Sequence, residues 1–360
     1  MPADSVLLPV FSDAVPIVFG ADEGFFVPLV VSIQSIISNA SNVKCYDIIV
    51  LANKFGKNYS SLLYSMAEGK DNISIRIYDV EPFLQKFDLS RLKTGHRLSL
   101  ATYYRLFMPE LMKDYKKIIY IDGDTVVLED ISVLYEYNLG NNYAGVVKDY
   151  NIIRDMSISF RYHVHQILQM KNVDCYFNAG VLLLNLDLIR RDFSLAFFME
   201  QAELKGAKHH DQDVLNSLFY GHVLFLPPRY NSMWQDEGLY AEVEGGRDAV
   251  ERPAIVHYPG GGKPWLKAGA FRPAARHFWK YALTCPYAER IVALCKEDCA
   301  RSVEEYSGQR RRFWWYLLLA RLLFGRKRRH YAAKVARLRE SLCETEKLMR
   351  KDQEFPWMTR

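Results

Sequence analysis

The feature that most constrains the fold is a regular alternation of strand-like and helix-like segments through the first 130 residues. Short runs rich in Val, Ile and Tyr predict strands, and apolar residues at helical spacing predict the helices between them. The predicted strands span residues 15–20, 46–51, 73–80 and 117–121, and the predicted helices span 25–38, 59–67 and 98–112. This order is typical of a mainly parallel sheet with helices on its faces, which places the chain in the α/β class.

The strand predicted at 117–121 ends in two aspartates, Asp122 and Asp124, separated by Gly123. In an open α/β sheet ligands bind outside the carboxyl ends of the strands, which is where these carboxylates are expected. Two neighbouring carboxylates repel each other unless a cation joins them, and hard oxygen ligands suit Mg²⁺ or Mn²⁺. Taken alone, the motif is also compatible with a polar turn that closes a strand.

The rest of the chain contains further short strand signals, two long helical ones and a change in composition. The strands are predicted at 143–147, 180–185, 223–226 and 254–257, and the helices at 152–170 and 188–204. After about residue 268 the composition shifts towards helix formers, aromatic residues and finally Arg and Lys. We therefore expect a main domain over 14–268, a helical extension over 269–309 and a basic, aromatic helical tail over 310–360.

The positive charge of the chain is concentrated at its C-terminal end. The formal net charge is +5, and residues 301–360 contain 16 Lys and Arg against 7 Asp and Glu, a balance of +9. The first 300 residues therefore carry +5 minus +9, or −4. A general nucleic-acid binder is not expected, because the basic residues are confined to one segment.

Several signals favour a reducing compartment inside the cell. The six cysteines are scattered and no pair has Cys-x-x-Cys spacing, which argues against a disulfide framework or a zinc site. The N-terminal segment carries Asp4 and Asp13 and lacks the basic and then apolar pattern of a signal peptide. No stretch reaches the roughly 18–20 apolar residues of a membrane-spanning helix. We therefore expect a cytoplasmic protein.

Two segments carry small and polar residues at the ends of predicted strands. Residues 17–22 end in Gly20, Ala21 and Asp22, which would let a flat ring or a phosphate approach the backbone. Residues 176–180 lead through Asn178 into a very apolar strand, and the side chain of this asparagine can both donate and accept hydrogen bonds. Each segment is also compatible with an ordinary turn beside a core strand.

A third segment, His209-His-Asp-Gln-Asp213, precedes another helical pattern. The segment is compatible with Asp211 or Asp213 as the N-cap of that helix, and because only one of them can be the N-cap, the other needs a different role. We interpret His209 and His210 as surface residues rather than metal ligands.

A glycine-rich loop follows the last predicted strand, with the sequence His257-Tyr-Pro-Gly260-Gly-Gly-Lys263-Pro-Trp265. Consecutive glycines expose backbone N–H groups that can hold phosphate oxygens, and Lys263 adds a positive charge beside them. His257 ends the strand and is a candidate metal ligand. The loop does not match the P-loop pattern, and it is also compatible with a flexible loop.

Four of these motifs, in this order, resemble those of the retaining nucleotide-sugar glycosyltransferases of family 8, which include bacterial lipopolysaccharide α-galactosyl- and α-glucosyltransferases. The likeness covers about residues 14–265. It consists of Tyr-Ile-Asp122-Gly-Asp124, Phe-Asn178-Ala-Gly180-Val-Leu-Leu-Leu-Asn, Asp211-Gln212-Asp213-x-Leu-Asn and His257-Tyr-x-Gly260-x-x-Lys263-Pro-Trp. The resemblance implies a GT-A fold, a Rossmann-like mixed sheet flanked by helices, with UDP-hexose as the donor substrate.

Carried over position by position, the resemblance implies roles for individual residues. Asp122, Asp124 and His257 would hold Mn²⁺ or Mg²⁺ on the diphosphate of the UDP-sugar. Lys263 would contact the same diphosphate. The other donor-binding positions, around the uracil, the nucleotide-sugar and the transferred hexose, would be Ala21, Asp22, Arg105, Gly123, Asn178, Ala179, Gly180, Asp211 and Gln212.

The same resemblance implies that Gln212 lies nearest the β-face of the anomeric carbon, with Asp149 and Gly260 on the acceptor side. The catalytic candidates are Gln212, Asp211 and Asp213. The transition state would resemble an oxocarbenium ion, and retention requires either double displacement or front-face attack within an ion pair. Gln212 is a poor nucleophile, which favours the front-face route. Asp213 is the alternative nucleophile if it can reach the anomeric carbon.

The tail has the composition of an interfacial helix. In residues 313–324 eleven of twelve side chains are apolar or aromatic, and basic clusters at 310–312 and 326–329 flank them. This segment is too short to span a membrane but suits binding to anionic lipid, although it would also suit packing on the main domain. With the resemblance, it predicts a glycosyltransferase attached to the inner face of the cytoplasmic membrane. The acceptor would be a lipopolysaccharide, a lipooligosaccharide or another lipid-linked glycan.

Two other functions fit parts of the sequence. A haloacid-dehalogenase-type phosphatase also has Asp-x-Asp at a strand tip, but here several βα units precede Asp122 and the Gly260–Trp265 loop would have no role. A catalytically silent nucleotide-sugar-binding protein on the same fold is the second alternative. The presence of Asp122, Asp124 and His257 argues against it.

Overall fold

The computed structural model describes residues 7–53, 55–87, 100–154, 157–204, 209–233, 240, 243–270, 272–322, 329–330, 332–336 and 339. The chain divides into two units, Met1–Pro259 and Gly260–Arg360, which are taken in turn.

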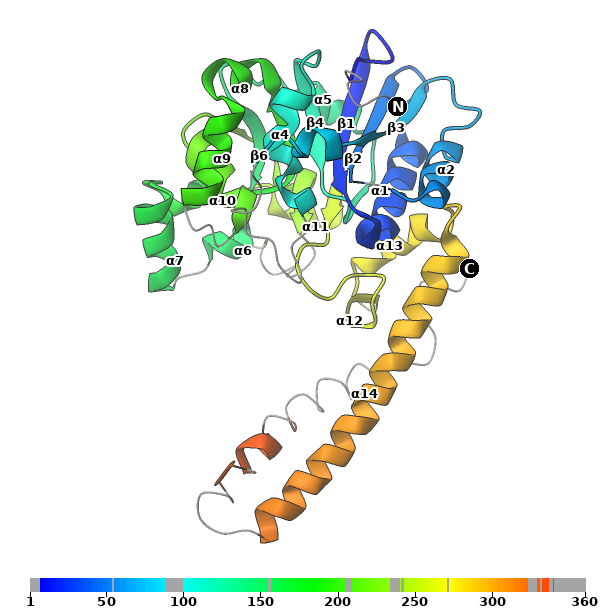
Figure 1. Cartoon of the computed structure of the whole chain (residues 1–360), viewed down its shortest axis with the longest axis vertical. Helices are drawn as coiled ribbons and strands as arrows, with labels where there is room; N and C mark the ends of the chain where they lie inside the picture. Colours follow the sequence, from blue (N-terminus) through cyan, green and yellow to red (C-terminus); the bar gives the residue numbers. More distant parts are fainter. Residues whose placement is uncertain are drawn as a thin grey trace. The chain divides into compact units, whose positions relative to one another are not determined.

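The Val- and Ile-rich runs of the first half pair as the alternation predicts (Figure 1). The strands β1 (Ala14–Ala21), β2 (Cys45–Ala52), β3 (Ile73–Asp79) and β4 (Lys117–Ile121) are parallel neighbours in the order β3-β2-β1-β4. Most residues of β1, β2 and β4 are buried, as expected of parallel strands covered on both faces. This half confirms the predicted α/β class.

The second half of the sheet is mixed. β7 (Phe177–Asn185) lies antiparallel between β4 and β6 (Ala144–Lys148), and β8 (Val223–Phe225) runs parallel to β6 at the edge. The complete order is β3-β2-β1-β4-β7-β6-β8, the mixed sheet that a GT-A fold requires.

A second, three-stranded sheet connects two distant parts of the sequence. β5 (Thr125–Val127) begins directly after Asp124, β9 is Ser232–Met233, and β10 (Ile255–His257) lies between them. β10 pairs antiparallel with β5, so that His257 lies opposite Thr125. This pairing brings the strand-terminal histidine to the acidic pair, although more than 130 residues separate them.

Helices cover the main sheet. α4 (Tyr104–Leu111), α8 (Leu186–Asp192), α9 (Leu195–Leu204) and α10 (His210–Phe219) share one apolar core with residues of β1, β2, β4, β6 and β7. α1 (Phe26–Asn39) packs beside β5, where Ser35 Oγ accepts a hydrogen bond from the Val127 N–H. The remaining helices of this unit include α2 (Lys57–Ser65), α3 (Glu81–Leu84), α5 (Ser132–Tyr135) and α11 (Gly246–Glu251).

The prediction of one helix over 152–170 is wrong. The structure has two short helices, α6 (Tyr150–Ile153) and α7 (Ile158–Tyr162), and then a π-helical turn, His163–Ile167. The side chains of Asp149 and Ser157 each accept a backbone hydrogen bond as N-caps, so each begins a new helix. The helix predicted at 188–204 is likewise two helices, because the backbone is extended at Phe193. The segment predicted as helical from residue 98 begins, among the described residues, with a 3₁₀ turn at Leu100.

The second unit is helical as far as it is described. It contains α12 (Lys267–Ala270), α13 (Ala275–Ala282) and α14 (Ala288–Leu322), and α13 buries Phe278 and Trp279. α14 continues through residue 310, where the tail was expected to begin. Most of the predicted tail beyond residue 322 lies outside the described residues. Within the described part of the chain, no helix is long and apolar enough to cross a membrane.

Candidate active site

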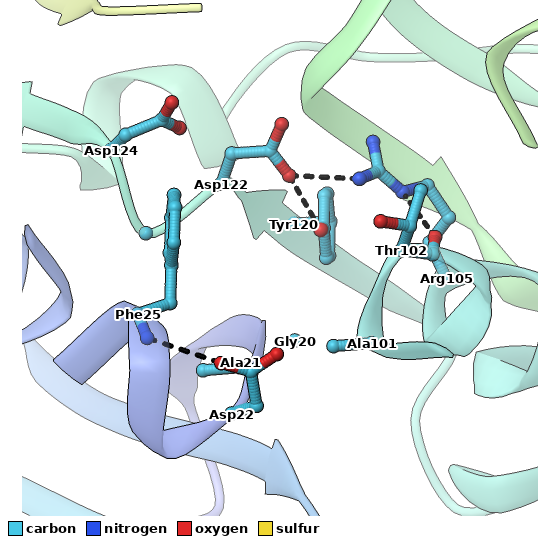
Figure 2. A pocket seen from close by; sticks show the side chains of 11 residues that line it. Gly20, Ala21, Asp22, Phe25, Ala101, Thr102, Arg105, Tyr120, Asp122 and Asp124 are labelled. Atoms are coloured by element: carbon cyan, nitrogen blue, oxygen red, sulfur yellow. Dashed lines mark hydrogen bonds and ion pairs between the residues drawn. The ribbon is translucent and has the colours of Figure 1, made fainter. Parts of the chain in front are cut away.

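The strand order places a crevice between the carboxyl ends of β1 and β4. The chain builds outward from β1 to β3 and then returns to the other side of β1, and ligands bind in open α/β sheets where the order reverses in this way. A cavity of roughly 170 Å³ lies there. It is lined by Gly20, Ala21, Asp22, Phe25, Ala101, Thr102, Arg105, Tyr120, Asp122, Gly123 and Asp124 (Figure 2).

Three predicted metal ligands converge beside this cavity. Oxygen atoms of Asp122 and Asp124 and a ring nitrogen of His257 lie within 4.8 Å of one another. The His257 Nε2 atom lies 3.4 Å from Asp124 Oδ1 and 3.8 Å from Asp122 Oδ2. Two carboxylates and one imidazole form a donor set that fits Mn²⁺ or Mg²⁺, and the buried positions of Asp124 and His257 limit competition from water.

The buried guanidinium of Arg105 holds one of these carboxylates in place. Its Nη2 atom donates to Asp122 Oδ1 at 2.9 Å, and its Nη1 atom donates to the carbonyl oxygen of Ala179. The hydroxyl of Tyr120 donates to the same Asp122 oxygen at 2.6 Å, and the guanidinium lies over the Tyr120 ring (Figure 2). The surrounding carboxylates raise the pKa of Arg105 above its usual range although burial opposes this, so the group is a permanent cation.

Asp211 is a buried carboxyl that shares this single cation with Asp122. Its Oδ2 atom lies 2.7 Å from Arg105 Nε, but that N–H points to the carbonyl oxygen of Thr102, so the Asp211 oxygen has no hydrogen-bond donor. Burial raises the pKa of Asp211 to about 7, with the negative charge of Asp122 adding to the effect and Arg105 opposing it. The structure therefore places a carboxyl with an unused oxygen against Arg105, which lines the cavity.

The side chains of Gln212 and Asn178 are held by backbone N–H groups of β7 and by one carboxylate. Gln212 Oε1 accepts from the Ala179 N–H at 2.9 Å, and Asn178 Oδ1 accepts from the Gly180 N–H at 2.9 Å. Both amide nitrogens donate to Asp149 Oδ2, at 3.2 and 3.1 Å. This arrangement brings the predicted sugar-side residues together in one network.

Asp213 is connected to this network through the hydroxyl of Tyr176, and its carboxylate is enclosed. It is fully buried, and its Oδ1 atom accepts from the Tyr176 hydroxyl at 2.7 Å. Its Oδ2 atom lies 2.8 Å from His163 Nε2 and accepts from the backbone N–H of His209 at 2.9 Å. The lone pairs of the Asp213 oxygens that accept these hydrogen bonds are not available to attack a sugar carbon.

The capping prediction for this segment is wrong. α10 begins at His210, and the residue before it, His209, occupies the N-cap position without a side-chain hydrogen bond. Neither Asp211 nor Asp213 is therefore the N-cap, although Asp213 reaches back to the His209 N–H. His209 is half-buried and lies against the rings of Phe160 and Tyr176, rather than on the surface.

Several residues of the site were not found from the sequence. Phe25 and Tyr120 line the cavity, and Asn231 is fully buried with its Oδ1 atom 2.9 Å from His257 Nδ1. A single aromatic residue in or after a strand, or an asparagine in an Arg-Tyr-Asn segment, belongs to no sequence motif that identifies it as a site residue. At the carboxyl end of β1, Asp22 accepts from the Phe25 N–H at 3.1 Å, which fixes the turn that lines the cavity.

Gly260 and Lys263 belong to the loop that begins the second unit. Gly260 has a positive φ of 71°, and the Lys263 ammonium lies 5.8 Å from the centre of the Trp265 ring. Their predicted contacts with the diphosphate remain a prediction.

The sequence profile described as Glycosyl transferase family 8 matches residues 16–269. This match covers more than two thirds of the chain and contains all four motifs. The chain belongs to glycosyl transferase family 8, which confirms the resemblance seen in the sequence. The phosphatase alternative has no support in this assignment.

Characterised relatives show which proteins the chain is similar to. It is 27% identical over 278 residues to a lipopolysaccharide 1,2-glucosyltransferase of Escherichia coli K12, an alignment covering 74% of this chain and 77% of that protein. It is 24% identical over 295 residues to a lipopolysaccharide 1,3-galactosyltransferase of Salmonella typhimurium, covering 77% of this chain and 80% of that protein.

Solved structures share the fold. The galactosyltransferase LgtC, solved in complex with donor and acceptor sugar analogs, superimposes with a TM-score of 0.60 at 28% identity, covering 79% of this chain and 96% of LgtC. The bifunctional glycosyltransferase WbbM gives a TM-score of 0.72 at 29% identity, covering 80% of this chain. This chain spans only about half, 53%, of WbbM. Both likenesses confirm the GT-A fold.

Proposed function

We propose that the protein is a retaining hexosyltransferase that moves galactose or glucose from UDP-hexose to a lipopolysaccharide, a lipooligosaccharide or another glycan acceptor. The observation that carries the proposal is the convergence of Asp122, Asp124 and His257 beside the cavity at the switch point of the sheet. Family membership and the two lipopolysaccharide glycosyltransferases among the relatives support the reaction class.

In this proposal the end of β1 receives the nucleotide. Ala21 and Asp22 contact the uracil, and the ring of Phe25 forms a wall of the same cavity. Asp122, Asp124 and His257 hold the divalent cation, and Lys263 contacts the diphosphate. When bound, the cation acts as a Lewis acid that stabilises the negative charge on the departing UDP.

The transferred hexose lies between two polar groups in this proposal. On one side, Asp211 offers the carboxyl oxygen that lacks a hydrogen-bond donor, which a sugar hydroxyl would supply. On the other, Asn178 and Gln212 present amides whose orientation is fixed by backbone N–H groups. Side chains that are held rigidly before the substrate binds can discriminate between sugars, because they do not reorient to bind a hydroxyl that points in a different direction.

The contacts of Asp213 favour front-face attack over double displacement. This carboxylate is fully buried and accepts from Tyr176 and from the backbone of His209, so a covalent bond to the sugar would break those contacts. In the front-face route the acceptor hydroxyl attacks the anomeric carbon on the side from which UDP departs. A phosphate oxygen of the departing UDP then takes the hydroxyl proton.

We also propose that the tail attaches the enzyme to the cytoplasmic face of the membrane. Trp314, Trp315 and Leu318 on α14 are 60%, 59% and 46% exposed, which is unusual for side chains of this size. The basic residues 310–312 precede them, and 326–329 follow. Aromatic side chains beside basic clusters suit a surface of anionic lipid that also carries a lipid-linked acceptor.

A donor panel with a defined acceptor tests the reaction. The protein is incubated with Mn²⁺, truncated lipopolysaccharide acceptors and UDP-glucose, UDP-galactose, UDP-N-acetylglucosamine or UDP-glucuronate, and the product linkage is determined by NMR. We expect one of the two hexoses to be transferred with an α linkage. A β-linked product would contradict retention, and release of phosphate from simple phosphomonoesters without sugar transfer would contradict the transferase assignment.

A further inference from the structure

A chain of hydrogen bonds runs from the backbone of β7 towards the ring of His257, and its first link is unambiguous. The Gly180 N–H donates to Asn178 Oδ1 at 2.9 Å, and Asn178 Nδ2 donates to Asp149 Oδ2 at 3.1 Å. A backbone N–H can only donate, so the Asn178 atom that it contacts is the carbonyl oxygen and the other atom is the amide nitrogen. Both ends of the Asn178 amide are therefore fixed.

The next two links follow from the first. Asn178 Oδ1 also accepts from Asn231 Nδ2 at 2.9 Å, so the other atom of the Asn231 amide is its carbonyl oxygen. That oxygen lies 2.9 Å from His257 Nδ1. A carbonyl oxygen has no proton to give, so the proton of this hydrogen bond belongs to Nδ1. In the neutral ring the lone pair then lies on Nε2, the nitrogen that faces Asp122 and Asp124.

The backbone holds these partners together. Asn231 directly precedes β9, and β9 pairs in parallel with β10, with Ser232 opposite Val256 and Met233 opposite His257. Asn231 is 0% and His257 2% exposed, so water does not compete for their hydrogen bond. Histidines that bind metals generally donate their second ring N–H to a carboxylate or a carbonyl, which sets the tautomer and the ring orientation.

We propose that Asn231 is a positioning residue that holds His257 in the Nδ1–H tautomer and thereby aims Nε2 at the metal. This inference rests on the proposed function, because it takes His257 to be a metal ligand. Through Asn178 and Asp149 the same chain reaches Gln212, whose Nε2 atom donates to Asp149. The metal end and the sugar end of the site thus share one continuous hydrogen-bond network.

The tautomer can be measured directly in the metal-free, full-length protein. Long-range ¹H–¹⁵N correlation spectra of protein labelled with ¹⁵N at histidine show which ring nitrogen carries the proton, and a His257→Gln variant identifies the signals of His257. His165 provides an internal reference, because its Nδ1 atom lies 2.8 Å from the carbonyl oxygen of Met170. We expect His257 to show the pattern of His165. An Nε2–H tautomer in the wild-type protein would overturn the proposal without any further variant.

Two substitutions of Asn231 separate positioning from general support of the fold. Asn231→Leu removes the acceptor, so we expect His257 to lose the pure Nδ1–H pattern and Mn²⁺ affinity to fall by about 10–100-fold. Asn231→Asp keeps an oxygen for the Nδ1–H but not the donor to Asn178. It should keep the tautomer and most of the Mn²⁺ affinity, measured from free Mn²⁺ by EPR.

A matched control and the contrary outcomes complete the test. Asn39 donates to the carbonyls of Ser35 and Val127, away from this network, so Asn39→Leu should leave both readouts at the wild-type values. Wild-type tautomer and affinity in folded Asn231→Leu would overturn the positioning role, as would loss of both in folded Asn231→Asp. If instead the proposed function is wrong, the wild-type protein should not bind Mn²⁺, or His257→Gln should bind it as well as wild type does.

Discussion

At the scale of single residues, the site depends on how closely β7 approaches the metal ligands. A Cβ atom at Gly180 would overlap the His257 ring, with Nδ1 at 2.8 Å, and would lie 2.9 Å from Asp122 Oδ2. Both neighbours belong to the metal cluster, and neither is the end of a flexible surface chain. The glycine is therefore required by the two ligands that pack against it, in addition to any contact with the sugar.

Gly180→Ala should displace His257 or Asp122 by a few tenths of an ångström or more. We expect weaker Mn²⁺ binding and a loss of about 100-fold in kcat/KM, the size associated with misplacement of a reacting group by about 1 Å. Gly308→Ala is the control, because a Cβ there meets nothing within 4 Å. Unchanged metal affinity and turnover in Gly180→Ala would show that the close approach is not needed.

Asp211 gives the metal-free protein a pH-dependent stability. Because folding raises its pKa from 3.8 to about 7, the folded state holds this proton more tightly than the unfolded state. The stabilisation is complete below about pH 4 and is lost as the pH rises through about 7. Asp211→Asn stays neutral, so its free energy of unfolding should rise relative to wild type between these pH values, by an amount on the order of a few kcal/mol.

Urea unfolding in EDTA from pH 4.5 to pH 8 measures this difference. Asp192→Asn is the control, because hydrogen bonds from Arg191 and Tyr143 lower the pKa of Asp192 from 3.8, so its difference from wild type should stay nearly constant over this pH range. If the difference in free energy of unfolding between wild type and Asp211→Asn stays constant with pH, the raised pKa of Asp211 is contradicted.

At the scale of elements, the site is assembled by strand ends from two sheets. The acidic pair links β4 of the main sheet to β5 of the small sheet, and β10 returns His257 by pairing with β5. Paired strands have a defined register, so the three ligands are positioned by the backbone and not by loop closure. β9 adds Asn231 through the same sheet.

α14 is the element proposed to contact the membrane. Trp314→Ala combined with Trp315→Ala should weaken partitioning of the full-length protein to anionic vesicles by at least about tenfold, since two buried indoles contribute more than about 1.4 kcal/mol. Binding should also fall with added salt and be weak on zwitterionic vesicles. Tyr64→Ala, at an exposed aromatic residue of α2, is the control and should bind as wild type. Equal binding of all three proteins would contradict membrane attachment through α14.

At the scale of the whole molecule, the sequence predicted the positions of the main-sheet strands well because buried strands carry a local signal, whereas the short strands β5 and β9 were not predicted. The β-branched runs that form β1 to β4 can be recognised without knowing their partners, and Asp122 follows such a run while His257 ends one. The four motifs were sufficient for the family, which the profile match confirms.

The parts that the sequence did not predict depend on tertiary partners. The helix expected at 152–170 is interrupted because Ser157 caps a new helix, a local choice that hydrophobic spacing does not reveal. Asn231 forms hydrogen bonds with Asn178 and His257, which are 53 and 26 residues away in the sequence. No spacing rule predicts such a contact, because it exists only after β9 and β10 have paired.

The central claim is that a divalent cation held by Asp122, Asp124 and His257 activates a UDP-hexose. The most direct measurement is the slow release of UDP from UDP-glucose and UDP-galactose without acceptor, with Mn²⁺ or with EDTA. It compares wild type, Asp124→Asn and the control Asp114→Asn, an exposed aspartate just before β4.

We predict that wild type and Asp114→Asn hydrolyse one of these donors only with Mn²⁺, and that Asp124→Asn loses this activity while remaining folded. UDP release that persists in EDTA, or that is unchanged in Asp124→Asn, would contradict the account.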